Sequence, residues 1–178
     1  ITFVKRDDYY EGPVVTLSQN GTSEYQKKVS TKVDIETKIG DLKEETIKYI
    51  VSDYKDAEAT EPVTNGQEIT IDGRTGTYYI IVESCNSIDI CSRFVSEPFY
   101  LDNTAPTIVY GTNGASTYAK SRSTTVTASD SHSQLNTLKY ITGTSKTATP
   151  STALTNGGKV TISGVTGNYY VVSQACDK

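Results

Sequence analysis

The chain has 178 residues, with 17 Lys and Arg against 21 Asp and Glu, a net charge of −4, and 35% hydrophobic residues. This balance argues against a nucleic-acid partner, because phosphate binding needs Lys and Arg clustered on a basic face, and no apolar stretch reaches the ~20 residues of a membrane span. Thr, Ser, Tyr, Val and Ile are frequent whereas Met and Trp are absent, a composition that favours strands over long helices.

Alternating polar and apolar residues predict short strands in two successive series. Residues 1–12 precede them and are predicted to be the tail of an earlier repeat or a linker. The first series lies near residues 13–17, 29–36, 46–52, 67–71, 77–84 and 90–95, with a final strand in 97–100. The second lies near residues 106–110, 122–129, 137–143, 158–162 and 168–175. Asn-Gly pairs at 20, 65, 113 and 156 predict turns, because both residue types accept a positive φ.

The two series are copies of one repeat. Residues 63–85 align without gaps on residues 154–176, with 11 of 23 positions identical at an offset of 91. Upstream, Pro13, Asn20-Gly21 and Tyr25 match Pro106, Asn113-Gly114 and Tyr118 at an offset of 93. A two-residue deletion between Ser129 and Leu138 joins the two registers and predicts a loop there, since insertions settle in loops.

The repeat predicts an all-β fold of two tandem antiparallel β-sandwiches, residues 13–103 and residues 104–178. Leu101-Asp-Asn-Thr-Ala-Pro106 is the predicted linker, ending in a Pro that starts the next strand. The second copy stops at Lys178, two residues after Cys176, so we expect it to be incomplete and to lack its last strand.

Three motifs together suggest a family. They are the linker Leu101–Pro106, the Thr-Asn-Gly before a short strand, and Gly164-Val-Thr-Gly-Asn-Tyr-Tyr-Val-Val172 leading to Ala-Cys-Asp-Lys178. In this combination the chain resembles the bacterial immunoglobulin-like (Ig-like) repeats of large cell-surface and adhesin-type proteins. The resemblance implies an extracellular location on the bacterial surface, long arrays of neighbouring repeats, and a role in holding adhesive or enzymatic parts away from the cell envelope.

Cys85 and Cys91 flank a turn-like stretch between two predicted strands. A hairpin brings such residues close enough for a disulfide, which an exported protein keeps. Cys176 has no local partner, because its counterpart of Cys91 would fall beyond residue 178.

Two Gly-x-Tyr segments stand where a strand enters each sandwich. Gly76-Thr-Tyr78 and Gly167-Asn-Tyr169 predict tyrosine corners, in which the hydroxyl binds a nearby backbone group. Adhesive aromatic patches are the alternative use of tyrosine here, with Tyr9-Tyr10, Tyr25 and Phe99-Tyr100 as the candidates.

Topology suggests a calcium site. If the first strand of the second repeat runs antiparallel to the next one, its start lies beside the loop after that strand and beside the segment following Cys176. Those places hold Asp102, Asn103, Asp130 and Asp177. Ca²⁺ takes six to eight oxygen ligands, which carboxylates and carbonyls supply. The alternative is an ordinary Asx turn at the linker, with no cofactor at all.

Catalytic chemistry is not expected. His132 lies with Ser131 and Asp130 in one short polar loop, whereas a Ser-His-Asp triad needs its members held apart on a scaffold. An internal Lys-Asn isopeptide bond needs a buried Lys, but Lys32, Lys48 and Lys139 alternate with apolar neighbours and should face outward.

Three functions remain open. The first is a non-catalytic stalk or spacer module whose partners are neighbouring repeats of the same polypeptide. The second is a direct adhesin that binds a host protein or glycan through its loops. The third is an accessory domain of an exported enzyme.

Overall fold

The computed structural model describes residues 11–178 and divides the chain into two compact units. Unit 1 ends at Asn103 and unit 2 begins at Thr104. Most of the predicted tail, residues 1–10, lies outside the described residues. Residues 11–178 contain no helix with the length and hydrophobicity that a membrane span requires.

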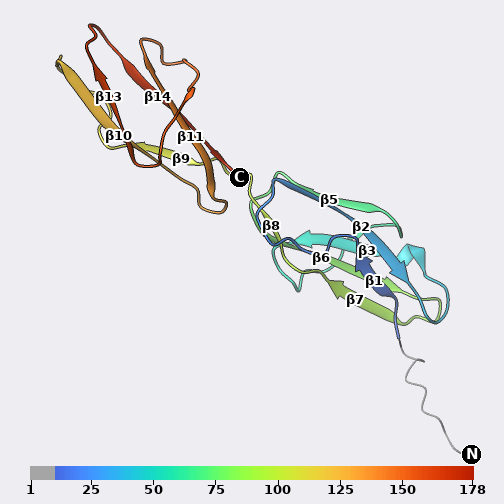
Figure 1. Cartoon of the computed structure of the whole chain (residues 1–178). Coiled ribbons are helices and arrows are strands. Elements are labelled where there is room, and N and C mark those ends of the chain that lie inside the picture. The colour runs from blue at the N-terminus through green and yellow to red at the C-terminus, as the bar shows by residue number, and fades with distance from the viewer. Residues whose placement is uncertain (1–10) are drawn as a thin grey trace, which may run out of the picture. The chain divides into compact units, whose positions relative to one another are not determined.

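Unit 1 is a sandwich of two antiparallel sheets (Figure 1). Its strands are β1 (Val14–Leu17), β2 (Lys28–Glu36), β3 (Lys48–Ser52), β4 (Glu61–Pro62), β5 (Glu68–Asp72), β6 (Gly76–Cys85), β7 (Cys91–Val95) and β8 (Phe99–Leu101). One sheet has the order β1-β2-β5 and the other the order β4-β3-β6-β7. The ten-residue β6 is long enough to pair with β7 along its second half and with β8 at its start.

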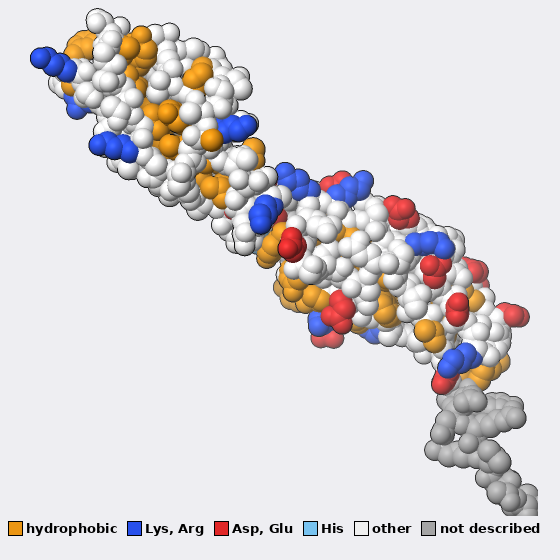
Figure 2. All heavy atoms as spheres, in the orientation of Figure 1, with side chains coloured by type: hydrophobic (Ala, Val, Ile, Leu, Met, Phe, Trp, Pro, Cys, Tyr) orange, Lys and Arg blue, Asp and Glu red, His pale blue; other side chains and the backbone are white. Residues whose placement is uncertain are grey.

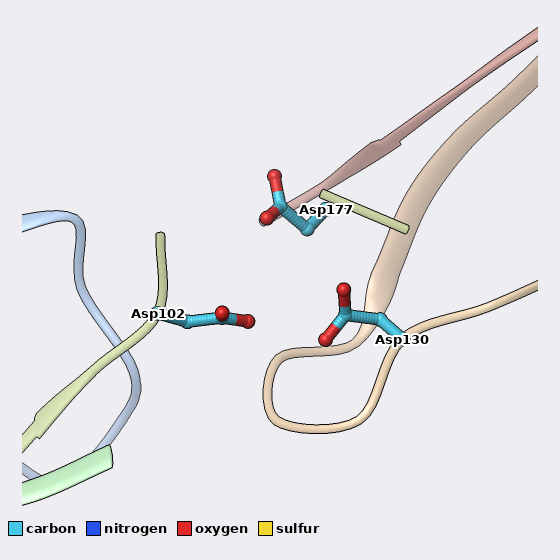
Figure 3. Close-up of side chains that lie close together, drawn as sticks. All are labelled: Asp102, Asp130 and Asp177. Atoms are coloured by element: carbon cyan, nitrogen blue, oxygen red, sulfur yellow. The ribbon is translucent and has the colours of Figure 1, made fainter. Parts of the chain in front are cut away.

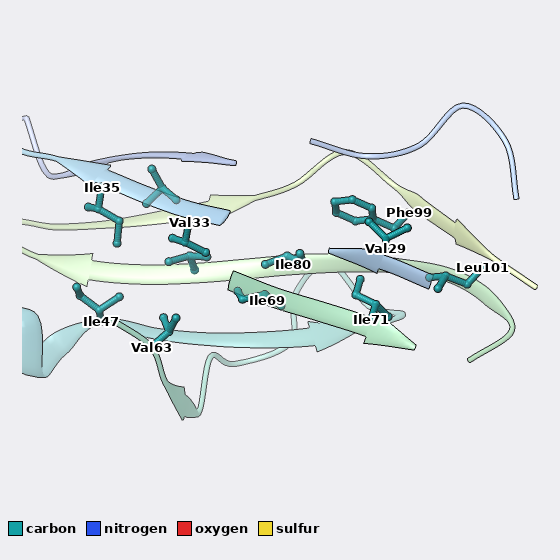
Figure 4. Close-up of a cluster of buried hydrophobic side chains, with 12 residues drawn as sticks. Val29, Val33, Ile35, Ile47, Val63, Ile69, Ile71, Ile80, Phe99 and Leu101 are labelled. Atoms are coloured by element: carbon teal, nitrogen blue, oxygen red, sulfur yellow. The ribbon is translucent and has the colours of Figure 1, made fainter. Parts of the chain in front are cut away.

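The period of two in β2 explains why this segment forms a strand of a sandwich. Its alternate residues Val29, Val33 and Ile35 are buried, while Lys28 and Lys32 are exposed. Successive side chains of a strand point to opposite faces, so β2 directs one apolar row at the second sheet. Figure 4 shows this row facing residues of β6, such as Ile80.

The core of unit 1 joins both sheets. It contains twelve buried residues: Val15, Val29, Val33, Ile35, Ile47, Val63, Ile69, Ile71, Ile80, Val82, Phe99 and Leu101. Ile81 points to the opposite face of β6 and is nevertheless fully buried. Arg93, on that same outer face, donates to the carbonyls of Lys55 and Ala57 and so holds the segment between β3 and β4 over it.

Unit 2 repeats the first six strands in the same arrangement. They are β9 (Thr107–Tyr110), β10 (Ser121–Ser129), β11 (Leu135–Gly143), β12 (Thr152–Ala153), β13 (Gly158–Ser163) and β14 (Tyr170–Asp177). The sheets have the orders β13-β10-β9 and β12-β11-β14. Among residues 104–178 nothing corresponds to β7 or β8, and the buried core consists of Val126, Ala128, Leu138 and Val160.

The all-β prediction of antiparallel β-sandwiches is therefore confirmed. Lys32, Lys48 and Lys139 are exposed, as their alternation predicts. The segment after β2 contains a short 3-10 helix, η2 (Glu44–Thr46), and the matching segment 130–134 of unit 2 is shorter.

Three details differ from the sequence prediction. The two-residue strands β4 and β12 were not predicted, because such short pairings leave no periodic pattern. The strand expected over 168–175 begins at Tyr170. Its counterpart β6 begins at Gly76 because residues 76–78 pair with β8, and no strand among residues 104–178 pairs in this way with residues 167–169.

Candidate functional site

The Thr-Asn-Gly motif has a structural role that the sequence prediction missed. The side-chain amide of Asn65 accepts from the Ile35 N–H at 2.8 Å and donates to the Ile35 carbonyl at 2.9 Å. Asn156 makes the same two bonds with Ala128, both at 2.8 Å. In each unit the side-chain amide of this Asn thus makes one accepting and one donating hydrogen bond with the second strand, as the backbone of a neighbouring strand does. The sequence signal for this role is that Asn precedes Gly in the motif of both copies. The turn itself requires only the Gly.

The predicted disulfide between Cys85 and Cys91 is confirmed. The two residues lie directly opposite each other where β6 and β7 begin their pairing. The hairpin between them is organised by Asn86, which is fully buried. Its side chain accepts from the N–H groups of Ile88 and Ile90 and donates to the Ile39 carbonyl, so a polar residue is satisfied inside the core.

An ion pair lies on the outside of the same hairpin. Asp89, at the turn with a positive φ of 61°, accepts a hydrogen bond from the Lys43 ammonium group. This hydrogen bond and the negative charge of Asp89 raise the pKa of Lys43. The pair is solvent-exposed at Asp89 and is an ordinary surface ion pair.

Cys176 is free and exposed on β14. It occupies the position in unit 2 that Cys85 occupies in unit 1, at the offset of 91.

The two predicted tyrosine corners differ. The Tyr78 hydroxyl donates to the Thr75 carbonyl at 3.4 Å, three residues upstream, which is the geometry of such a corner. Tyr169 makes no corresponding bond within the described part of the chain, so the corner expected there is wrong. Instead the Tyr110 hydroxyl of β9 donates to the Val171 carbonyl at 3.4 Å.

Asp130 and Asp177 form an acidic pair in unit 2. Asp130 lies in the loop after β10 and Asp177 ends β14, with one carboxylate oxygen of each within 4.8 Å of the other (Figure 3). The Oδ1 of Asp130 accepts from the N–H groups of His132 and Ser133 at 2.9 and 3.0 Å, whereas its Oδ2 is buried without a hydrogen-bond partner. The loop is therefore held by an Asx turn that Asp130 Oδ1 makes.

Asp102 and Asn103 belong to unit 1. The Asp102 N–H donates to the Gln26 carbonyl, and the Asn103 side chain donates to the carbonyls of Lys27 and Arg74. The amide nitrogen of Asn103 thus secures the end of β8. Calcium binding by the four residues predicted from the sequence stays a prediction.

The Ser-His-Asp sequence does not form a triad. Ser131 Oγ contacts Nδ1 of the adjacent His132 at 2.8 Å, and both residues are exposed. The Oδ1 of Asp130 binds backbone N–H groups of the loop. The three side chains serve one local turn, and the triad geometry of a scaffolded nucleophile is not met.

The aromatic candidates for adhesion divide into buried and exposed residues. Phe99 is fully buried in the core of unit 1, so its assignment to a surface patch is wrong, and Tyr25 packs on Tyr100 at 5.6 Å between ring centroids. Tyr9-Tyr10 lie outside the described residues. Within residues 11–178 the exposed tyrosines are Tyr54 and Tyr118, with 72% and 86% of their surface accessible.

The two units carry charges of opposite sign. Residues 1–103 contain 19 acidic and 11 basic residues, whereas residues 104–178 contain two acidic and six basic residues. Figure 2 shows acidic and basic side chains interspersed over unit 1. The two carboxylates that unit 2 possesses are Asp130 and Asp177, the acidic pair described above.

No family model matches the chain, and no curated protein matches it. A solved structure of fibronectin(III)-like modules of Clostridium thermocellum CbhA is similar over 92% of this chain and 86% of that chain, with 16% identity and a TM-score of 0.36. A likeness of this size establishes neither a family nor a function.

Proposed function

We propose that this chain is a non-catalytic β-sandwich repeat module of a bacterial surface protein, located outside the cell and acting as a stalk or spacer. One observation carries the proposal. The polar residues that recur in both units, Asn65 and Asn156, are used to fasten one strand to another. A spacer module needs hydrogen bonds of this kind between its strands in every copy. It does not need a ligand site in every copy.

The disulfide supports the extracellular location. Disulfides persist in oxidising compartments and are reduced in the cytosol. Cys85 and Cys91 flank the turn of a hairpin, and their bond covalently closes this turn between β6 and β7. In an exported module this closure limits local opening of the hairpin.

The partners that this function requires are neighbouring repeats of the same polypeptide. It requires no cofactor, no nucleic acid and no membrane insertion of these residues. Calcium binding by Asp130 and Asp177 is a separate prediction, tested in the Discussion, and the spacer function does not depend on its outcome.

The proposal is tested by pulling the chain between its ends in a single-molecule force experiment. We expect two separate unfolding events, one for each unit, because each unit has its own core. The same protein should show no saturable binding to host cell surfaces and no hydrolase turnover. Turnover that disappears in a His132→Ala variant, or saturable binding to host cells, would contradict the spacer function.

A direct adhesin is the second candidate, and the surface of unit 2 favours one ligand class. Tyr118 is exposed in the segment before β10, close in sequence to the exposed Lys120 and Arg122. Exposed tyrosine beside basic residues suits an anionic host glycan, because an aromatic ring packs on sugars and the cations pair with sulfate or carboxylate groups.

The adhesin is tested on immobilised heparin with a salt gradient. Weaker retention of the Tyr118→Ala and Arg122→Gln variants would support it. Lys55→Gln in unit 1 is the control, because it removes one positive charge at another place and should leave retention unchanged. Elution of the wild type and of both variants at the same low salt would leave the spacer as the better function.

A further inference from the structure

The segment that joins β3 to β4 in unit 1 has a counterpart between β11 and β12 in unit 2. Residues 51–62 align without gaps on residues 142–153 at the offset of 91. In each segment one lysine ammonium group lies over a tyrosine ring of the long strand that follows. These pairs are Lys55 over Tyr79, at 4.9 Å from the ring centroid, and Lys146 over Tyr170, at 5.0 Å. The two segments therefore occupy the same place in their units.

The two segments differ at every acidic position of the first. The segment of unit 1 carries four exposed carboxylates, those of Asp53, Asp56, Glu58 and Glu61. Each of these residues is replaced by an exposed threonine in unit 2, namely Thr144, Thr147, Thr149 and Thr152. Ser145 and Ser151 add two more exposed hydroxyl groups between them. The surface that is acidic in unit 1 is thus covered by hydroxyls in unit 2.

This exchange of charge for hydroxyl extends over the whole of unit 2. Positions 104–178 hold eight charged residues and 26 serines and threonines, whereas positions 1–103 hold 30 charged residues and 19 serines and threonines. Charged side chains commonly make up about 25–35% of a protein surface and keep it hydrated. Unit 2 falls short of this proportion. A hydrophilic group attached to its hydroxyls would supply the hydration that carboxylates supply in unit 1.

The hydroxyls of the unit 2 segment are accessible to an enzyme. Residues 144–151 belong to no strand or helix. The Thr144 and Thr149 hydroxyls make no hydrogen bond within the described part of the chain. Ser145 Oγ and Thr147 Oγ1 contact each other at 3.1 Å, and both side chains are exposed. A modifying enzyme would therefore reach these groups without unfolding the unit.

The composition of the segment favours one kind of modification. Residues 144–153 contain six serines and threonines together with Pro150 and two alanines, and Ser/Thr-rich tracts with proline are typical of O-glycosylated stalks. Pro150 disfavours the helical region for Thr149 and keeps it extended. Phosphorylation uses the same hydroxyls, but its donor ATP is a cytosolic compound, whereas the disulfide of unit 1 is typical of an oxidising compartment.

We propose that residues 144–152 are an acceptor segment for O-glycosylation, with sugars attached to the exposed threonine hydroxyls. The inference rests on the extracellular location in the proposed function. The co-substrate is a sugar activated as a diphosphate ester. The threonine oxygen attacks the anomeric carbon and forms the new C–O bond, the bond to the diphosphate breaks and its electron pair leaves with the diphosphate, and the hydroxyl proton passes to a base of the transferase.

The test uses the whole chain, isolated from the surface of the cells that produce it. Trypsin cuts after Lys146 and Lys159 and releases residues 147–159, which are sequenced by mass spectrometry with electron-transfer fragmentation. We expect a sugar mass increment on the threonines of this peptide and its loss on alkaline β-elimination. The tryptic peptide 56–74 of unit 1 is the internal control, because it carries acidic residues at the matching positions and should have no increment.

Two variants separate this segment from the other hydroxyls of unit 2. The first carries the residues of unit 1, as Thr144→Asp, Thr147→Asp, Thr149→Glu and Thr152→Glu. It should fold, because unit 1 has these residues at the same places, and its intact mass should lose the increment. The second, Thr161→Val, removes an exposed threonine of β13 outside the segment and should keep the increment.

Protease added to intact cells reports separately whether the chain is displayed. A displayed chain with unmodified residues 147–159 would overturn the proposal and leave the spacer function intact. An increment that phosphatase removes would assign phosphate to the segment and overturn the proposal too. Equal increments on the unit 1 peptide would contradict it, since they would show modification of any exposed hydroxyl. A chain confined to the cytosol would overturn the extracellular location and this inference together.

Discussion

Removing the side-chain amide of Asn65 should weaken unit 1 and leave unit 2 unchanged. Asn65→Ala deletes two hydrogen bonds, at 2.8 and 2.9 Å, to the backbone of Ile35. Ile35 is buried, with 4% of its surface accessible, so water replaces these bonds poorly. At about 1 kcal/mol for each bond, the free energy of unfolding of unit 1 should fall by about 2 kcal/mol.

Asn156→Ala is the matched variant in unit 2, because Asn156 makes the same two bonds with Ala128. It should lower the free energy of unfolding of unit 2 by a similar amount and leave unit 1 unchanged. Asn65→Asp is a finer control. It keeps an acceptor for the Ile35 N–H but places a carboxylate oxygen against the Ile35 carbonyl, so it should be at least as destabilising as Asn65→Ala.

The assay is urea unfolding followed by the methyl NMR signals of Val33 and Val126, which are fully buried in unit 1 and unit 2 respectively. With an m value of about 1–2 kcal/mol/M, the loss corresponds to a midpoint shift of about 1–2 M in the affected unit. A shift below about 0.3 M would refute the reasoning, since it would mean that water satisfies the Ile35 backbone fully. Equal shifts of both signals in either variant would refute the independence of the two units.

Three further outcomes are expected. The double variant Cys85→Ala, Cys91→Ala should destabilise unit 1 by about 2 kcal/mol from the entropy of a short closed loop, with residues six apart in sequence, and an unchanged urea midpoint of unit 1 would contradict this. Added Ca²⁺ should raise the melting temperature of unit 2, and Asp130→Asn, which keeps an acceptor for the loop N–H groups, should abolish the increase; a chelator without effect on the wild type would dismiss calcium binding. Tyr78→Phe should cost about 0.5–1.5 kcal/mol in unit 1, whereas Tyr169→Phe should cost nothing measurable, and calorimetry distinguishes the two.

The local alternation of polar and apolar residues was sufficient to predict most of the strands. Val29, Val33 and Ile35 alternate with polar residues, and a strand with one buried face requires this period wherever it lies in the chain. The disulfide was predictable for the same reason, because Cys85 and Cys91 flank a turn and a hairpin necessarily brings them together. The sequence prediction failed at Tyr169, where a motif repeated from unit 1 does not make the same hydrogen bond in unit 2.

The sequence by itself determined the class of the fold, the number of copies and the positions of the main strands, because side-chain periodicity and repetition are properties of neighbouring residues. Tertiary structure decided which distant groups meet. Asn65 binds Ile35 across 30 positions of the chain, and Phe99 enters the core instead of the surface. Such contacts depend on the packing of two sheets against each other, and periodicity along one strand contains no information about the partner that another strand supplies.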